Sequence, residues 1–358
     1  MSFKLLTNFK SLHKLDRVLY IGVFFTFLIS IYLLCFGIIT SLVSFASGTV
    51  AFIALILIIY NYQDKWSLKY DLSKYLLYIA IASFLPCYFL GTARINHVRP
   101  KYDEYLINVD NLLFGWLWER GQLSLTLDKS ERFNPETTFG VFLSSFLQVF
   151  YFLYYITPYG LIYVFALRRC ILETIHSVKN NGNTRSTHFQ NWHDLYFITS
   201  VFVWTLNQNF LLNTFLPAVS PRLYFKDTYV HQLKMYGVFK FMQSTFKDNK
   251  SANAYPSGHC SKMFCMAFAL FRMGHYIIGS VVLVCALFVM MATLVLRYHY
   301  ISDFIAALVI SVTAIAISSL FYENKKEVSE VDVSDLLKEN GKLEMDLPNV
   351  DTGSYMTE

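Results

Sequence analysis

The sequence predicts an all-α, polytopic membrane protein, a bundle of about eight membrane-spanning helices. Of its 358 residues, 55% are hydrophobic and only 15% are charged, whereas soluble domains carry roughly 25% charged residues. The apolar residues gather in long stretches without charge, and about 20 such residues cross a bilayer as a helix. One such stretch would also suit a buried helix of a soluble protein, but all of them together would not. The formal charge of +5 is mild and gives no nucleic-acid signature.

The apolar runs place the spans near residues 18–42, 47–62, 75–93, 138–167, 195–216, 258–272, 275–297 and 301–321. The first charge-free stretch, Val18–Gln63, is long enough for two helices, and we expect the break at the small, polar Ser47–Gly48–Thr49. The sixth run is shorter and is interrupted by Lys262. Between the third and fourth runs, Asp110–Gly115 followed by Trp116 predicts an interfacial helix, because aromatic side chains sit at the headgroup level.

An even number of spans places both termini on one side of the membrane. The connecting segments on that side are Met1–Arg17, Asp64–Lys74 and Arg168–Asp194, and all three are rich in lysine and arginine. By the positive-inside rule this side is cytoplasmic. Residues 323–358 are charged and poor in aromatics, which predicts a disordered cytoplasmic tail.

Three short polar motifs interrupt the apolar sequence, each at the end of a predicted span. They are Pro217–Arg222 (PAVSPR), Tyr255–His259 (YPSGH) and His299–Asp303 (HYISD). The predicted topology places all three on the side opposite the cytoplasm. We therefore expect one lumenal site, in the Golgi or endoplasmic reticulum, or a periplasmic one in a bacterial host.

The residue types in these motifs suit phosphate-ester chemistry. Asp303 can accept a hydrogen bond from one nitrogen of His299 and leave the other nitrogen as a nucleophile. His259 is placed to act as a general acid, after Ser257 and Gly258, where helix-start N–H groups bind phosphate oxygens. The alternative for His299 and Asp303 is a pair that only caps a helix.

Arg222 ends the first motif, and a guanidinium can grip two phosphate oxygens. Its alternative role is to anchor a helix end to lipid headgroups. The six cysteines show no CxxC spacing and predict neither a disulfide framework nor a zinc site. No cluster of acidic residues predicts a metal site, so we expect no metal and no cofactor.

The motifs resemble those of the type-2 phosphatidic acid phosphatase superfamily, which are Lys-x6-Arg-Pro, Pro-Ser-Gly-His and Ser-Arg-x5-His-x3-Asp. The second is intact as Pro256–His259, and the third keeps His299 and Asp303. The family's Ser-Arg falls on Ala292–Thr293; Phe215 occupies the lysine position and Leu223 the proline position. The resemblance covers about Leu195–Phe321, with weaker similarity at Asp110–Gly115.

The Pro-Ala-x-x-Pro segment and Thr293 look like the branch that contains fungal inositol phosphorylceramide synthase. That resemblance implies a six-helix core at 137–322, after N-terminal helices and an interfacial segment at 1–136. It also implies attack on phosphorus by His299, oriented by Asp303, to form a phosphohistidine-type intermediate. His259 would protonate the leaving oxygen, while Arg222, Ser257 and Gly258 hold the phosphate.

Two enzyme functions use these residues. One is a transferase that moves a phospho-headgroup of the inositol phosphate type from a glycerophospholipid to a lipid alcohol such as ceramide. The other is a phosphatase acting on phosphatidate, a sphingoid phosphate or a polyprenyl diphosphate. Membrane lipids are the expected partners in both cases. A third reading is a non-catalytic membrane protein or transporter that reuses the fold.

Overall fold

The computed structural model describes residues 14–37, 41–60, 101–131, 133–179, 187–237 and 253–320. Within these residues the protein is helical and has no β-strand, apart from an isolated bridge between Ala218 and Asn253. This confirms the predicted all-α class. The helices are α2 (Lys14–Gly37), α3 (Ser41–Tyr60), α5 (Asp103–Phe114), α6 (Leu123–Asp128), α7 (Thr138–Lys179), α8 (Thr187–Phe215), α9 (Pro221–Tyr224), α11 (Gly258–Arg272), α12 (Tyr276–Val295) and α13 (Ile301–Ser319), with a 3₁₀ turn, η1, at Glu119–Gly121.

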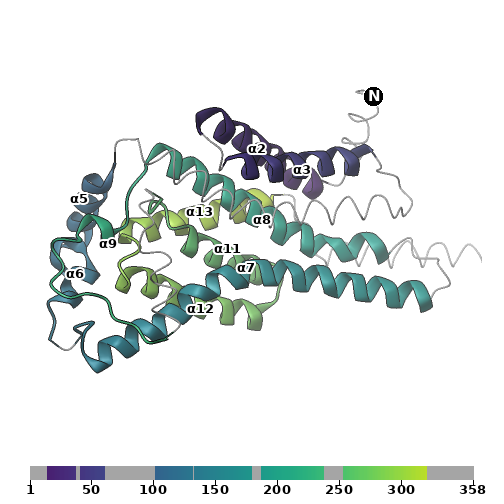
Figure 1. Ribbon diagram of the computed structural model, residues 1–358. Coiled ribbons are helices and arrows are strands. Elements are labelled where there is room, and N and C mark those ends of the chain that lie inside the picture. Colours follow the sequence, from purple (N-terminus) through teal and green to yellow (C-terminus); the bar gives the residue numbers. More distant parts are fainter. Residues whose placement is uncertain are drawn as a thin grey trace, which may run out of the picture.

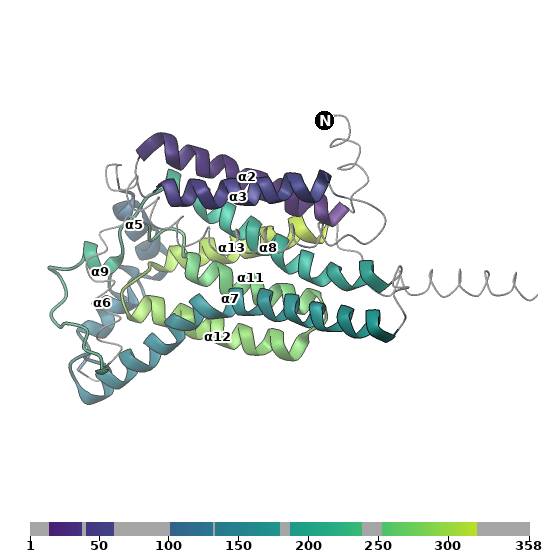
Figure 2. The same ribbon diagram turned by 45° about the vertical axis from the view of Figure 1, so that its right-hand side comes forward.

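The long helices form a bundle, and the short helices gather at one end of it (Figure 1). Helices α7, α8, α11, α12 and α13 run along a common direction, and α2 and α3 pack together on the outer side of α8. The turned view shows the same arrangement, with α5, α6 and α9 again at one end of the bundle (Figure 2). Helix α5 contacts α13, and α6 contacts α12, so the short helices cover the α12–α13 connection.

The bundle has apolar surfaces and polar side chains inside. In the described part of the chain, four helical segments are long and apolar enough to cross a membrane: Thr138–Phe165, Asp194–Phe215, Tyr276–Val295 and Ile301–Ser319. Helix α12 has a mean hydropathy of 2.7, yet Ile277 on it is 84% exposed. Soluble proteins rarely expose apolar surface on this scale. Helix α8, in contrast, buries Asn207 and Asn209. These features identify a polytopic membrane protein.

Helix α11 is the centre of the bundle. It contacts α7, α8, α12 and α13, and every residue from Cys260 to Leu270 except Phe268 is buried. Its 15 residues extend about 22 Å, less than the roughly 30 Å of a bilayer's hydrocarbon core. The predicted sixth span is therefore a short core helix enclosed by its neighbours.

The predicted break at Ser47–Gly48–Thr49 is wrong, because all three residues lie inside α3. Helix α2 ends at Gly37 and α3 begins at Ser41. Serine and threonine hydroxyls can bond to the carbonyl four residues earlier, so they need not interrupt a helix. The predicted span at 75–93 and the predicted tail at 323–358 lie outside the described residues, and the total of eight spans stays a prediction.

Candidate active site

Two histidines and an aspartate from two helix starts meet at the covered end of the bundle. His299 Nδ1 lies 3.0 Å from Asp303 Oδ2, and His299 Nε2 lies 3.2 Å from His259 Nδ1. Because a carboxylate oxygen only accepts, His299 carries its proton on Nδ1 and keeps a lone pair on Nε2. His259 Nδ1 then donates to that lone pair. The geometry defines an oriented nucleophile next to a proton donor.

Asp303 reaches His299 from the first turn of α13, and His299 itself precedes the helix. The helix begins at Ile301, with Tyr300 as its N-cap and Asp303 as its third residue. Asp303 Oδ2 also accepts the Tyr300 backbone N–H at 2.9 Å, as the acidic residue of a capping box does. The geometry of the pair is therefore set by a helix cap, with His299 before the helix and Asp303 in its first turn. Asp303 caps the helix and also orients the histidine.

The backbone before His299 is a helix C-cap of the Schellman type. Arg297 N donates to Leu294 O at 3.2 Å and Tyr298 N to Thr293 O at 2.9 Å, the two bonds that define the motif. His299 N donates to the same Thr293 carbonyl at 3.1 Å. Arg297 has φ of 68°, a left-handed conformation that usually requires glycine. A non-glycine residue here implies that its side chain is needed.

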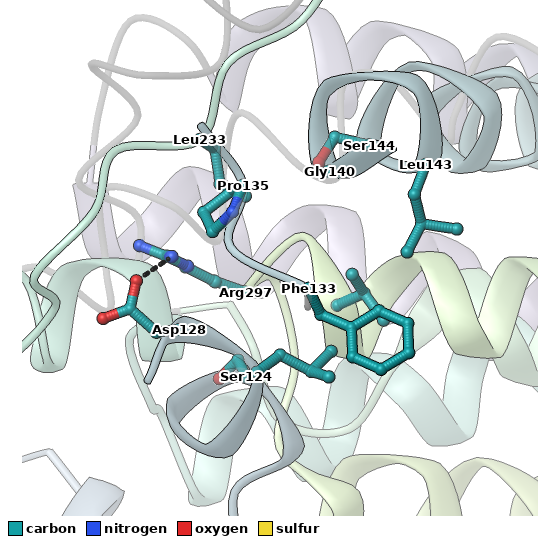
Figure 3. Close-up of a pocket in the computed structure, with 11 residues that line it drawn as sticks. Ser124, Asp128, Phe133, Pro135, Gly140, Leu143, Ser144, Leu233 and Arg297 are labelled. Carbon is teal, nitrogen blue, oxygen red and sulfur yellow. Dashed lines mark hydrogen bonds and ion pairs between the residues drawn. The ribbon is translucent and has the colours of Figure 1, made fainter. Parts of the chain in front are cut away.

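The Arg297 side chain ties this turn to the short helices. It donates to Asp128 Oδ1 at 2.8 Å and to the His231 carbonyl at 3.0 Å, and it lies 3.7 Å from the centre of the Tyr229 ring. Burial raises the pKa of Tyr229 to about 12, so the ring is neutral beside the guanidinium. Figure 3 shows the ion pair at the edge of a small cavity walled by Phe133 and other apolar residues. The Arg297 side chain therefore serves to stabilise the fold. It does not replace the arginine of the third motif, whose position is occupied by Thr293 in this chain.

Two substitutions separate the free-energy cost of the left-handed backbone at Arg297 from the stabilisation that its ion pair with Asp128 provides. Arg297→Ala removes the ion pair and keeps the left-handed strain, whereas Arg297→Gly removes both. Losing one partner of a buried pair costs about 3–5 kcal/mol, and left-handed backbone costs about 1 kcal/mol. Both variants should melt below the wild type in detergent, with the glycine variant the more stable. An alanine variant at least as stable as the glycine variant would contradict this reading of the turn.

Two buried aspartates of α5 hold the same end of the bundle. Asp110 accepts the Ile301 and Ser302 backbone N–H groups at 3.0 and 2.8 Å, and Gln122 Nε2 at 2.7 Å. Asp103 accepts the Tyr300 hydroxyl at 2.8 Å and Val219 N at 3.2 Å. Burial raises the pKa of both carboxyl groups, and these hydrogen bonds oppose that shift. Asp110 therefore fixes the start of α13, and Asp103 joins the first motif to the third.

The first motif is held by backbone bonds on both sides. Pro217 O accepts Tyr102 N at 3.0 Å, Ala218 O accepts Ala254 N at 2.9 Å, and Arg222 N donates to Arg297 O at 2.8 Å. Arg222 Nη1 is buried without a hydrogen-bond partner in the described part of the chain. A buried guanidinium nitrogen without a partner is costly, which suits a position that receives an anion.

The second motif caps α11 and contacts α13. The Ser257 side chain accepts Cys260 N at 3.3 Å, and Ser257 N donates to the Asp303 carbonyl at 3.2 Å. Gly258 begins the helix. The His259 ring packs against α7, with ring centres 4.6 Å from Tyr151 and 4.1 Å from Tyr154. The position of His259 is thus fixed by the Ser257 cap at the start of its helix and by two aromatic rings of α7.

The six residues singled out in the sequence therefore lie around one turn. His259, His299 and Asp303 are in direct contact, and Ser257 and Arg222 are joined to this group through backbone bonds. The sequence interpretation missed the supporting carboxylates, Asp103, Asp110 and Asp128. These three are among seven acidic residues between the third and fourth predicted spans, and no periodicity in that segment indicated their partners.

The fold and the site together describe a helical membrane protein with a His–His–Asp cluster at one end of its bundle. In comparison with known proteins, residues 217–327 match the PAP2 superfamily. The match contains Arg222, Ser257, Gly258, His259, His299 and Asp303.

The chain is also similar to a PA-phosphatase related-family protein of Dictyostelium discoideum, with 29% identity over 253 residues. That alignment covers 66% of this chain and 44% of the relative, so the chain spans less than half the length of the protein it matches. No solved structure matches the chain.

Proposed function

We propose that the protein is an integral membrane lipid phosphotransferase that works through a phosphohistidine-type intermediate on His299. The observation that carries the proposal is the hydrogen-bonded series Asp303–His299–His259 at the covered end of a membrane bundle. The donor would be a glycerophospholipid with a phospho-headgroup of the inositol phosphate type. The acceptor would be a lipid alcohol such as ceramide.

The reaction has two steps. His299 Nε2 attacks phosphorus, the bond from phosphorus to the leaving oxygen breaks, and His259 transfers its proton to that oxygen. The acceptor hydroxyl then gives its proton to His259 and attacks phosphorus, and the bond to His299 breaks. Because His259 Nδ1 contacts His299 Nε2 at 3.2 Å before substrate binds, the phosphoryl group must enter between the two rings. Arg222 and the first N–H groups of α11 would bind its oxygens.

Two observations favour transfer to a lipid over hydrolysis. His299 is 6% exposed and Asp303 is fully buried, and exclusion of water disfavours hydrolysis of a reactive intermediate. Phe215 and Thr293 leave two family cation positions neutral, which suits a phosphodiester with one negative charge better than a monoester. The second candidate is a lipid phosphate phosphatase, and the description of the Dictyostelium relative favours it.

An assay on purified protein in detergent separates the two candidates. One sample contains phosphatidylinositol with labelled ceramide or diacylglycerol, and a second contains phosphatidate and is followed for free phosphate. A new labelled phospholipid that is absent with His299→Ala supports the transferase. Free phosphate alone supports the phosphatase. No product in either sample would contradict both candidates.

We also propose that the site faces the lumen or periplasm and that the C-terminal tail is cytoplasmic. The support is the basic composition of the segments expected on the other side of the membrane.

A further inference from the structure

Lys262 is a fully buried charged residue on the central helix of the bundle. It is 1% exposed and lies four residues after Gly258 on α11. A lysine among apolar helices of a membrane protein is costly and marks a functional site by default. The two-step reaction proposed above makes no use of it.

The Lys262 side chain points to the start of α11, where the phosphate would bind. Side chains on a helix lean toward its N-terminus, so a residue reaches the turn before its own. Lys262 Nζ lies 3.6 Å from the point that a Cβ atom on Gly258 would occupy. The glycine therefore leaves the ammonium group directly behind the helix-start N–H groups, which attract anions.

A second polar group converges on the same place. Asn209 Oδ1, from α8, lies 3.8 Å from the same Gly258 point. Asn209 is 4% exposed, and its Oδ1 has no hydrogen-bond partner in the described part of the chain. Buried polar atoms are normally paired. The Asn209 oxygen is therefore suited to accept a hydrogen bond when substrate binds, either from a hydroxyl of the ligand or from the Lys262 ammonium group after it shifts.

Tyr154 connects Lys262 to His259. Lys262 Nζ donates to the Tyr154 hydroxyl at 2.8 Å and lies 4.5 Å from the centre of its ring. The centre of the same ring is 4.1 Å from that of His259. The ammonium group and the proton-transferring histidine therefore contact the same aromatic ring.

We propose that Lys262 is a substrate-binding residue whose ammonium group neutralises charge on the phosphoryl group held at the start of α11. This inference rests on the proposed phosphotransfer function. It adds one positive charge to a site in which Phe215 and Thr293 are neutral and Arg297 is paired with Asp128, so the site still has one cation fewer than the motifs it resembles. The charge comes from inside the bundle, one helical turn below the site.

Orthovanadate, a phosphate analogue, tests the proposal on the purified full-length protein without lipid turnover. Its affinity is read from the concentration dependence of thermal stabilisation. Lys262→Gln removes the charge but keeps an N–H donor for Tyr154, and Lys262→Arg keeps the charge. We expect the glutamine variant to bind orthovanadate about tenfold or more weakly, and the arginine variant to recover most of that loss.

Tyr154→Phe tests the alternative that Lys262 only supports the fold through its hydrogen bond. This variant removes the bond and leaves the ammonium group, and its orthovanadate affinity should stay within about threefold of the wild type. A loss of tenfold in Tyr154→Phe, or unchanged affinity in Lys262→Gln, would overturn the assignment. If Lys262→Gln does not fold, a tenfold loss of orthovanadate affinity in Lys262→Arg or in Tyr154→Phe would still overturn the assignment.

The lipid assay keeps the two proposals distinguishable. If the wild type turns over lipid but Lys262→Gln binds orthovanadate with unchanged affinity, only the role of Lys262 is rejected and the proposed function stands. Absence of lipid turnover in the wild type would reject the proposed function, whatever the orthovanadate result. With active protein, Lys262→Gln should raise KM more for phosphatidate than for phosphatidylinositol, because a monoester carries more negative charge.

Discussion

His299→Ala is expected to reduce product formation from the lipid donor by about a thousandfold or more, to the background rate. Nε2 of His299 is the atom that the geometry prepares for attack, since Asp303 fixes the proton on Nδ1. Loss of a nucleophile removes the covalent route and leaves only binding and electrostatic contributions. The measurement is the initial rate with the donor and acceptor that the wild type converts.

The matched variant for this prediction is His275→Ala, a histidine at the opposite end of α11 and α12. His275 is the N-cap of α12 and lies 4.0 Å from Asp194, remote from the three motifs in sequence and element. Its replacement should change the rate far less than that of His299. Equal rates for His299→Ala and the wild type would refute the assignment of the nucleophile.

Asp110→Ala is expected to lower the stability of the protein by about 3–5 kcal/mol and to lose most activity as well. The carboxylate accepts two backbone N–H groups at the start of α13 and one side-chain donor, and it offsets the positive end of the helix dipole. Its removal leaves buried donors without partners, which is among the most destabilising of single changes. Because Asp303 lies one and two residues after the bonded N–H groups, movement of this turn also displaces the His299–Asp303 pair.

Two further variants serve as controls for the effect of Asp110→Ala on stability. Asp110→Asn keeps one carbonyl oxygen and should fall between alanine and wild type. Asp227→Ala, on a side chain that is 90% exposed, should change stability by no more than about 0.5 kcal/mol. Thermal unfolding in detergent measures all three. An alanine variant at position 110 with the melting temperature of the Asp227 control would contradict the anchoring role.

The membrane class and the cluster of His259, His299 and Asp303 could be predicted from the sequence because each has a local signal. Charge-free runs of spanning length identify membrane helices without tertiary information. The three motifs stand out because polar residues are unusual at the ends of such runs. Ser47–Thr49 misled the assignment of a helix break because small polar residues are compatible with a membrane helix.

The supporting residues could not be predicted because their partners are distant in sequence. Asp110 bonds to Ile301 and Ser302, and Asp128 bonds to Arg297. Nothing in the sequence between the third and fourth predicted spans indicates that its aspartates bond to the connection between α12 and α13. Lys262 was visible as the one charge in an apolar run, but only the structure shows its approach to Gly258.

Direct detection of a phosphorylated His299 is the measurement that tests the central claim most directly. A His259→Ala variant, given a phosphate ester with a good leaving group, should form the intermediate without the acid and resolve it slowly without the base. Rapid quenching at neutral or alkaline pH preserves the phosphorus–nitrogen bond, and peptide mass spectrometry locates it. We predict one phosphoryl group, or one phospho-headgroup, on the peptide that contains His299, and none in His259→Ala/His299→Ala. Turnover without any adduct, or an adduct on another residue, would contradict the mechanism.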